Sequence, residues 1–309
     1  MVAKNILIGA GGFIGSNLLE RLISHGSDVI AIDRKFTNQI IDNVHYIGGD
    51  GLDLSLYDHI NFESSTLIYL GGNSRPSKIA LSIYDEINLE SKGFLQLCEY
   101  AGKRGISKII FCSSGGTIYG ESISEINFET DLERPINFYG FSKLLNEQAL
   151  RLLSFQYNFQ SVALRLSNPF GPRQFAKEGQ GFIAAAMSSL FENKQLKIWG
   201  DGRIVRDFIY IDDVVQAFIS ALNYEGGNII ANIGTSIGYS LLDVCSTITE
   251  VSGRSLDLAF ESSRSVDVSR NVLSNRVARD LLFWQPQVDF KSGIFDTYVW
   301  WKNHADCQW

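Results

Sequence analysis

The sequence predicts an α/β fold, a doubly wound parallel sheet combined with a smaller α/β lobe. Short apolar runs alternate with longer helical patterns through the first half of the chain, as in parallel-sheet proteins. The runs are almost continuously apolar, which is typical of strands buried on both faces. The predicted strands are Asn5–Ile8, Val29–Ile32, Val44–Ile47, Leu67–Leu70, Ile109–Phe111 and Ser161–Leu166, and the predicted helices are Ile14–Ser24, Ile87–Arg104 and Phe141–Phe155.

The regular alternation ends after Leu166. Residues 168–205 are rich in turn residues, glycines and arginines, as expected of a segment that covers a ligand. We expect residues 1–167, joined by strands and a helix from about 205–235, to form one domain, and residues 168–204 and 236–309 to form a lobe that binds the substrate. Further predicted elements are strands Phe208–Ile211 and Ile229–Ile233, an extended run Leu256–Phe260, and helices at 213–222, Asn275–Leu282 and Lys291–Trp301.

Composition and charge narrow the class of protein. The 309 residues are 45% hydrophobic and 20% charged, which is ordinary for a soluble globular enzyme and too apolar for a disordered chain. The net charge of −7 argues against a nucleic acid or an anionic membrane as the main partner. No apolar run approaches the ~18–20 residues of a membrane span, and the first residues do not resemble a signal peptide.

Cysteine usage predicts reduced thiols. The four cysteines, Cys98, Cys112, Cys245 and Cys307, are widely scattered, and none forms a C-x-x-C pair or lies at zinc-ligand spacing from a histidine. We therefore expect a cytoplasmic protein that binds no metal.

A glycine-rich turn joins the first predicted strand to the first helix. Gly9, Gly12 and Gly15 fit the spacing G-x-x-G-x-x-G, with Phe13 and Ile14 between the last two. Small residues let the backbone approach a pyrophosphate, and the helix N-terminus attracts it with free N–H groups and a positive dipole end. The turn, from Gly9 to Gly15, is therefore predicted to hold a dinucleotide in a Rossmann-type fold.

An acidic residue ends the second predicted strand. A carboxylate at Asp33 can accept both ribose hydroxyls of an adenosine and repels a 2′-phosphate. Arg34 and Lys35 follow directly, either as solvated charges or as groups that tolerate a 2′-phosphate. We expect NAD to be preferred, with Arg34 among the cofactor contacts, and NADP stays open as the alternative.

Tyr139 and Lys143 open a predicted helix four residues apart, so that both side chains share one face. A lysine ammonium beside a phenol favours phenolate and lowers the pKa of the phenol. Tyr139 is therefore predicted to serve as a general acid and base near neutral pH, and Lys143 can also hold a nicotinamide ribose.

Taken together, these motifs resemble the extended short-chain dehydrogenases/reductases, in particular the NAD-dependent nucleotide-sugar epimerase/dehydratase family. The resemblance covers nearly the whole chain. It implies cofactor contacts for Asp50 and Gly51 near the adenine. It implies further contacts along the middle of the cofactor for Leu70, Gly71, Gly72, Asn88 and Ser113. The matching segments are Gly9–Gly15, Asp33, Gly49–Asp50, Leu70–Gly72, Asn88, Ser113–Gly120, Tyr139–Lys143, Arg165–Pro172, Val205–Asp213 and the region after Arg264.

The chain departs from the family at its third catalytic residue. The family has a Ser or Thr four positions before the Tyr of a Tyr-Gly pair, and here that position is Gly115. The hydroxyl that polarises the sugar C4 oxygen must come from elsewhere, and the candidates are Thr117, which we favour, and Ser114. The 4,6-dehydratases carry Asp-Glu after the hydroxyl, which this chain lacks. Cys112 lies too early to match the cysteine of the 3,5-epimerase/reductases that make GDP-fucose.

The resemblance also implies a site for the substrate. Asn168 matches the residue that contacts the sugar diphosphate, Arg206 matches an arginine that binds the diphosphate, and Arg264 fits a second phosphate clamp. A guanidinium binds phosphate oxygens bidentately. The alternative for Arg206 is an ion pair with Asp207 or Asp212.

The function that follows is hydride transfer at C4 of a nucleotide-diphosphate sugar. A 4-epimerase similar to UDP-glucose 4-epimerase, in surface-polysaccharide precursor synthesis, is the main interpretation. One alternative is a 4-ketoreductase, such as a dTDP-4-dehydro-6-deoxyglucose reductase that makes dTDP-fucose. Another is a non-catalytic NAD(P)-binding sensor on the same fold. The resemblance also implies a homodimer in which helices at 87–104 and 141–155 pair.

Overall fold

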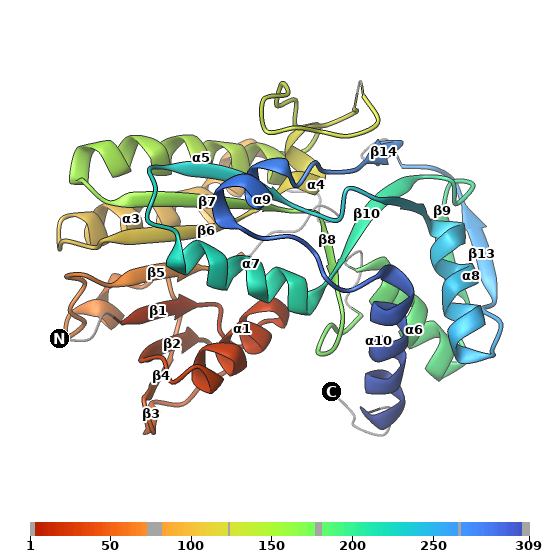
Figure 1. Ribbon diagram of the computed structural model, residues 1–309, viewed down its shortest axis with the longest axis horizontal. Helices are drawn as coiled ribbons and strands as arrows, with labels where there is room; N and C mark the ends of the chain where they lie inside the picture. Colours follow the sequence, from red (N-terminus) through yellow and green to blue (C-terminus); the bar gives the residue numbers. More distant parts are fainter. Residues whose placement is uncertain (1–3, 73–81, 123, 177–180, 265–266, 305–309) are drawn as a thin grey trace.

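The structure is a computed structural model that describes residues 4–72, 82–122, 124–176, 181–264 and 267–304. The chain forms two lobes, a large sheet flanked by helices and a smaller lobe that begins with the strand following residue 167 (Figure 1). Among the described residues no helix is long and apolar enough to cross a membrane. Cys98, Cys112 and Cys245 are free thiols, and Cys307 lies outside the described residues.

The large sheet has eight strands in the order β11-β7-β6-β5-β1-β2-β4-β3. All neighbouring pairs are parallel except β3 and β4. The predicted strands of the first half are confirmed, with ends that agree to within three residues. The strands are β1 (Asn5–Ile8), β2 (Val29–Asp33), β3 (Gln39–Ile41), β4 (Val44–Gly48), β5 (Thr66–Tyr69), β6 (Lys108–Ser114), β7 (Gln160–Leu166) and β11 (Ile229–Ile233).

Helices cover both faces of this sheet, as a doubly wound fold requires. In β1, Leu7 belongs to the core on the side of α1 and α7, whereas Ile6 and Ile8 belong to the core on the side of α3 and α5. All three side chains are buried, which explains the continuous apolar runs. The helices of this lobe are α1 (Phe13–Ser24), α2 (Ile83–Glu86), a π-helix (Ile87–Lys92), α3 (Gly93–Gly102), α4 (Gly115–Ile118), α5 (Phe138–Tyr157), α7 (Ile211–Asn223) and α9 (Arg276–Leu282), with a 3₁₀ turn at Leu54–Tyr57.

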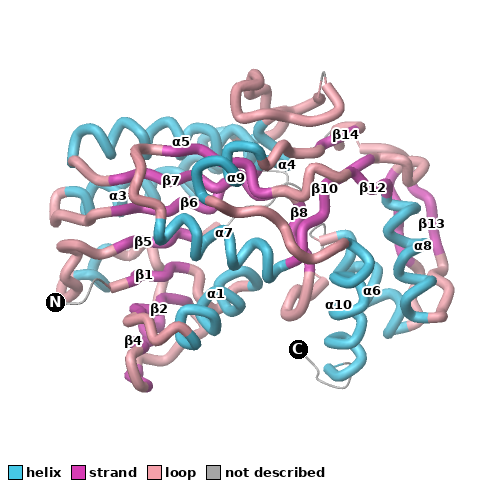
Figure 2. Tube along the Cα trace, in the orientation of Figure 1, coloured by secondary structure: helices cyan, strands magenta, loops and turns pink. Residues whose placement is uncertain are grey.

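The smaller lobe contains two further sheets. One joins β12, β10 and β14, with β8 also paired to β10, and the other pairs β9 with β13. Its three helices, α6, α8 and α10, pack against one another (Figure 2). The elements are β8 (Asn168–Phe170), α6 (Phe182–Glu192), β9 (Leu196–Trp199), β10 (Val205–Tyr210), β12 (Gly238–Ser240), α8 (Leu241–Ser252), β13 (Leu258–Glu261), β14 (Arg270–Asn271) and α10 (Phe290–His304).

The expected boundary between the lobes needs two corrections. Helix α9 lies in the segment 236–309, which is expected in the smaller lobe, but it packs against α7 and β11 of the large one. Residues 205–235 are expected in the domain of the large sheet, but the structure divides them. Helix α7 packs against α1, and β11 completes the large sheet. Strand β10 instead lies in the sheet of the smaller lobe, because its backbone pairs with β8, β12 and β14.

Candidate active site

A cavity of about 1030 Å³ lies where the carboxyl ends of the central strands face the smaller lobe. Ligands of open α/β sheets bind at this edge because the loops that follow the strands converge there. The cavity brings together thirteen of the predicted site residues from both lobes. They are Gly9, Gly12, Phe13, Ile14, Gly15, Leu70, Ser113, Ser114, Thr117, Tyr139, Asn168, Arg206 and Arg264.

Other predicted residues do not line this cavity. They are Asp33, Arg34, Asp50, Gly51, Gly71, Gly72, Asn88 and Lys143. Lys143 is buried behind the wall, whereas Asn88 is exposed on the π-helix. Two residues further along that helix, Glu90 is buried, and its Oε2 lies 3.6 Å from the position that a Cβ on Gly72 would take. The structure therefore turns Glu90, rather than Asn88, towards the interior.

The glycine turn forms a cradle that excludes side chains. Gly9 has φ +80°, which favours glycine. A Cβ on Gly15 would overlap the Gly9 carbonyl oxygen, and a Cβ on Gly12 would lie 3.2 Å from the same atom. Helix α1 begins directly after Gly12, and no side chain caps it, so its first N–H groups have no partner within the helix. This geometry fits a dinucleotide pyrophosphate.

Asp33 lies at the end of β2 beside this cradle. Its carboxylate accepts hydrogen bonds from the backbone N–H groups of Gly11 and Lys35, both at 3.0 Å. Arg34 pairs with Asp50 at 2.6 Å and is thereby drawn away from Asp33. The negative charge at the strand end therefore fits the ribose diol of NAD.

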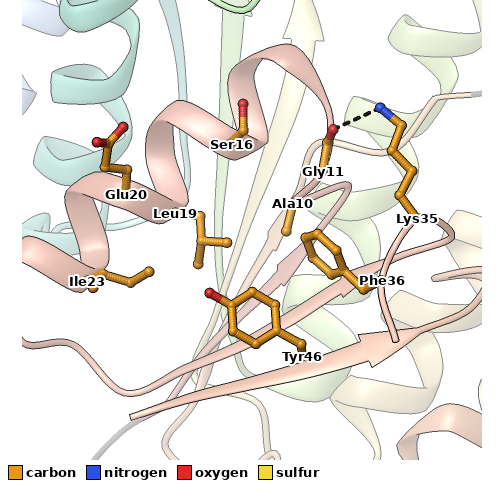
Figure 3. Close-up of a pocket in the computed structure, with 9 residues that line it drawn as sticks. All are labelled: Ala10, Gly11, Ser16, Leu19, Glu20, Ile23, Lys35, Phe36 and Tyr46. Carbon is orange, nitrogen blue, oxygen red and sulfur yellow. Dashed lines mark hydrogen bonds between the residues drawn. The ribbon is translucent and has the colours of Figure 1, made fainter. Parts of the chain in front are cut away.

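A second, smaller pocket of about 430 Å³ opens on the other side of the turn (Figure 3). The Lys35 ammonium donates to the Gly11 carbonyl at 3.2 Å at its rim, and Glu20 lies on the opposite side. Phe36 and Tyr46 form its aromatic base with ring centroids 5.3 Å apart. Lys35 lines both pockets.

Tyr139 lies in the first turn of α5, where the Asn137 side chain accepts the Gly140 N–H at 2.7 Å and caps the helix. The helix thus begins three residues earlier than predicted. The Lys143 ammonium lies 5.4 Å from the Tyr139 ring centroid and donates to the Cys112 carbonyl at 3.3 Å. The predicted pair is therefore assembled against the end of β6, with the phenol facing the cavity and the ammonium behind it.

The charges around this pair set its protonation. Burial raises the pKa of the Tyr139 hydroxyl, and the Lys143 ammonium opposes that shift without cancelling it. The sequence interpretation considered only the lysine, so the structure corrects the direction of the net pKa shift. For Lys143, burial lowers the pKa, but the negative charges of Tyr139 and Glu90 outweigh it, so the pKa is raised and the ammonium stays protonated.

Three hydroxyl groups lie at the end of β6 and in α4, and they have different partners. Ser113 donates to the buried Glu147 carboxylate at 2.5 Å, and that carboxylate also pairs with Arg165 at 2.7 Å. Thr117 donates instead to Ser114 at 3.0 Å. Ser113 is therefore engaged in a buried network, whereas Ser114 and Thr117 form a pair on the cavity wall.

Two arginines of the smaller lobe bring positive charge to the cavity. Arg264 pairs with Asp267 at 2.9 Å and lies 5.0 Å from the Trp199 ring centroid. Arg206 donates to the Val205 carbonyl at 2.9 Å, and among the described residues no carboxylate lies within ion-pair distance of it. Burial, together with the charge of Arg264, lowers the pKa of Arg206. An anionic ligand would stabilise both guanidinium groups.

The structure adds cavity residues that the sequence analysis did not name as contacts. Arg173 was missed although it directly follows the matching segment Arg165–Pro172. Its guanidinium donates to the Ser16 carbonyl at 3.1 Å and pairs with Glu20 at 2.6 Å. These contacts bind the loop that carries Arg173 to α1. Nothing in the local sequence indicates that the C-terminal helix α10 reaches the cavity. The added residues include Gly116, Asn137, Ser167, Arg173, Gln174, Phe175, Trp300 and His304.

Comparisons with known proteins agree with this geometry. Residues 6–234 match the model of the NAD dependent epimerase/dehydratase family. A putative UDP-glucose 4-epimerase of Methanocaldococcus jannaschii is 33% identical over 97% of this chain and 98% of its own length. A dTDP-4-dehydro-6-deoxyglucose reductase of Escherichia coli is 35% identical, but over 62% of this chain and 60% of its own.

Solved structures give the same picture. The UDP-glucose 4-epimerase of Thermotoga maritima, solved with UDP-glucose, superposes with a TM-score of 0.89 at 28% identity, and the match covers 98% of this chain and 100% of that one. The Rossmann-type fold, the cofactor cradle and the Tyr139–Lys143 pair thus occur together in one chain. This chain belongs to the NAD dependent epimerase/dehydratase family.

Proposed function

We propose that this enzyme is a nucleotide-sugar 4-epimerase that uses NAD and acts on a UDP-hexose. The observation that carries the proposal is the single cavity in which Tyr139, the glycine cradle and the two arginines Arg206 and Arg264 meet. A cradle at one end and two guanidinium groups at the other suit a dinucleotide and a nucleotide diphosphate whose reacting sugar lies at the tyrosine between them. The full-length similarity to UDP-glucose 4-epimerases supports the same reaction.

Each residue of the cavity has its own role in the proposed reaction. Tyr139 takes the proton of the C4 hydroxyl and later returns it to the C4 oxygen. Lys143, whose ammonium lies 5.4 Å from the Tyr139 ring centroid, opposes the rise that burial causes in the pKa of that phenol. Arg206 and Arg264 bind the diphosphate. The chemistry that NAD supplies when bound is reversible removal of the C4 hydride, so a return to the other face inverts C4 with no net oxidation.

The first experiment measures cofactor content and turnover of the purified protein. We expect NAD to be retained at about one per chain, because a closed redox cycle never releases it. We also expect conversion of UDP-glucose to UDP-galactose without added cofactor, followed by chromatography. A protein that neither retains NAD nor interconverts the two sugars contradicts the proposal.

Two observations favour a 4-ketoreductase as the second candidate. The family hydroxyl position is Gly115, and a reductase of E. coli matches this chain over about three-fifths of its length. In that case the protein would bind NADH or NADPH reversibly and would consume it stoichiometrically with a 4-dehydro-6-deoxy nucleotide sugar. The same measurement of cofactor content and turnover, repeated with the 4-dehydro-6-deoxy nucleotide sugar, separates the two reactions.

We also propose that two copies associate through α5 and the preceding π-helix. On the outer face of α5 the apolar side chains Phe141, Leu152 and Phe155 are exposed, and Tyr84 and Leu89 are exposed on the neighbouring segment. Exposed apolar side chains concentrated on one face are typical of an interface. Light scattering should give the mass of a dimer, and Phe155→Lys should shift the measured mass towards the 34.5 kDa of one chain.

A role in surface-polysaccharide synthesis stays a prediction of the resemblance.

A further inference from the structure

We propose that Glu90 is a positioning residue for the Tyr139–Lys143 pair: its buried carboxylate balances part of the charge of the ammonium and so weakens the pull of that ammonium on the phenol. The inference rests on the proposed function, in which Tyr139 takes the C4 hydroxyl proton and returns it. The sequence analysis considered only the lysine beside the phenol, and Glu90 adds a charge of opposite sign.

One helical segment carries Glu90 into the protein. Helix α2, the π-helix and α3 follow one another without a break over residues 83–102. Within the π-helix Asn88 is exposed, whereas Glu90 and Ser91 are buried. A π-turn is rare, and it occurs frequently at functional sites. The change of pitch thus coincides with a carboxylate that turns inward, on the side of the sheet that carries the tyrosine and the lysine.

Two contacts locate Glu90 next to the catalytic helix. The Asn146 side chain of α5 donates to the Glu90 backbone carbonyl at 3.3 Å, and Asn146 shares a helix face with Lys143, three residues before it. On its other side, the Glu90 Oε2 atom lies 3.6 Å from the position that a Cβ on Gly72 would take, directly after β5. Strand β5 pairs with β6, whose Cys112 carbonyl accepts the ammonium. Glu90 therefore lies between the end of β5 and the part of α5 that carries the lysine.

The charges around the pair act in opposite directions. Burial is the main cause of the raised pKa of Tyr139, and the Lys143 ammonium lowers that pKa. The Glu90 carboxylate raises it, and Glu86, whose Oε1 accepts the Ser142 hydroxyl at 3.4 Å, does so more weakly. For Lys143 burial lowers the pKa, but the negative charges of Tyr139 and Glu90 raise it above its usual value. Glu90 thus stabilises the ammonium and opposes its effect on the phenol.

Two further titratable groups face this region and carry no charge near neutral pH. Burial raises the pKa of the Cys112 thiol to about 11. Burial also raises the pKa of Tyr69, on β5, well above its usual value, and Glu90 adds to that rise. Among the described groups that act most strongly on the phenol, the charged ones are therefore Lys143, Glu90 and Glu86.

The arrangement explains why a carboxylate is buried at this place. Burial of a charge costs free energy unless an opposite charge or hydrogen-bond donors compensate it, and Lys143 supplies positive charge close by. In return, Glu90 keeps the lysine protonated. It also keeps the Tyr139 hydroxyl protonated to a higher pH than the lysine alone would allow. A phenol that holds its proton suits a group that must return a proton to the sugar.

The first test follows the Tyr139 phenol without any substrate. Absorbance after a rapid pH jump reports phenolate formation before the protein can unfold, and the signal of Tyr139→Phe is subtracted. Glu90→Gln keeps the shape of the side chain but removes its charge, so the pKa of Tyr139 should fall by at least about 0.5. Glu90→Asp keeps the charge and should stay closer to wild type than Glu90→Gln does.

Two more variants complete this test. Glu99→Gln is the matched control, because Glu99 is a solvent-accessible glutamate of α3 that pairs with Lys103, and it should leave the pKa of Tyr139 unchanged. Glu90→Asn also removes the charge and needs less room, so it replaces Glu90→Gln if that variant does not fold. Circular dichroism shows which variants are folded.

The second test measures the pH profile of kcat/KM with UDP-glucose. In Glu90→Gln the acid limb should move to lower pH by at least about 0.5, since a phenol with a lower pKa forms its phenolate at lower pH. Lys143→Met should move it in the opposite direction. A purely structural role of Glu90 would instead lower kcat/KM at every pH and leave the acid limb in place.

The outcomes separate this inference from the proposed function. If the pKa of Tyr139 is unchanged or raised in a folded charge-removing variant, the assignment of Glu90 is wrong while epimerase activity of the wild type stands. An acid limb that does not move in an active variant has the same meaning. If the wild type does not interconvert UDP-glucose and UDP-galactose but the pKa still falls in Glu90→Gln, the proposed function is wrong and the electrostatic role of Glu90 stands.

Discussion

At the scale of single residues, the proposed reaction should depend on Tyr139. Phenylalanine keeps the ring but cannot take the C4 hydroxyl proton, so Tyr139→Phe should lower kcat by about 10²–10⁴, the usual contribution of a general base. Retained NAD and an unchanged circular dichroism spectrum serve as controls for folding. Full turnover in this variant would mean that another group takes the proton.

Lys143 should control the pH at which the tyrosine becomes active. Burial raises the pKa of Tyr139 and the Lys143 ammonium lowers it, so Lys143→Met leaves the effect of burial unopposed. The acid limb of the kcat/KM profile should therefore move to higher pH, since a phenol with a higher pKa forms its phenolate only at higher pH. Lys103→Met is a matched control because Lys103 is an exposed lysine that pairs with Glu99. An unmoved acid limb in Lys143→Met would show that the lysine does not act on the phenol.

Asp33 should decide between NAD and NADP. Two unit charges of like sign ~4 Å apart repel by about 1 kcal/mol in water and by more where solvent is excluded, and 1.4 kcal/mol is tenfold in affinity. We expect NADPH to bind at least about 10-fold more weakly than NADH, and Asp33→Asn to reduce that ratio, because Lys35 remains beside it. Dissociation constants from calorimetry test this, and tighter binding of NADPH by the wild type would contradict it.

The sequence predicts those parts of the site whose residues lie close together along the chain. The glycine turn lies within one strand-turn-helix unit, and Tyr139 and Lys143 lie within one helix, so short spacings predict both. The structure places the glycine turn and Tyr139 on the large cavity, whereas Asp33 and Lys143 do not line it. Residues that reach the cavity from other elements were not foreseen, such as Arg173 and Trp300. Asn88 is a different case: a π-helix starts at Ile87 and turns it outward, and no periodic pattern in the sequence signals that change of pitch.

At the scale of elements, continuous apolar runs predicted the large sheet well because both of its faces are buried. The smaller lobe was predicted less completely. Helix α6 begins directly after Gly181, whose left-handed backbone gives no capping signal. Its mostly apolar sequence lacks a clear polar face. Helix α8 had a readable signal, a capping box in which Ser240 and Asp243 bond each other's backbone. The sequence analysis therefore overlooked a readable pattern for α8. For α6 the sequence offers no such pattern, which is a physical reason for missing it.

A buried lysine links β6 to the end of α7. The Lys108 ammonium donates to the carbonyls of Ala221, Leu222 and Tyr224 at 3.1, 2.7 and 2.6 Å, which satisfies the acceptors at the helix C-terminus. Lys108→Met keeps the apolar stem but leaves these carbonyls unpaired, and should lower the free energy of unfolding by about 2–3 kcal/mol. Urea titration measures it, and Lys194→Met is the matched control, since Lys194 is an exposed lysine. A change within about 0.5 kcal/mol would mean that water replaces the lysine.

At the scale of the whole molecule, the two lobes are joined at Asp207. This fully buried residue of β10 accepts hydrogen bonds from the backbone of Ser236 and Leu273 and from the backbone and side chain of Thr235. Asn168 donates to its carbonyl at 2.9 Å. The same carboxylate thus binds the loop after β11 of the large sheet and the segment that contains Leu273. Asp207 therefore contributes to the contact between the two lobes.

The ionisation of Asp207 should be visible in the stability of the protein. Burial raises its pKa to about 6 although the donors around it lower it. The folded state then binds the proton more tightly than the unfolded chain, so this contribution to stability is complete below pH 3.8 and is lost as pH rises through about 6. Between pH 7 and pH 5 the free energy of unfolding should gain roughly 1 kcal/mol from this group. Asp207→Asn, which cannot titrate, should lose that gain, so the difference between the two pH profiles isolates it in urea titrations. If the four donors instead outweigh burial, the pKa lies below 3.8 and the wild type loses stability on acidification relative to Asp207→Asn, which would reverse the sign.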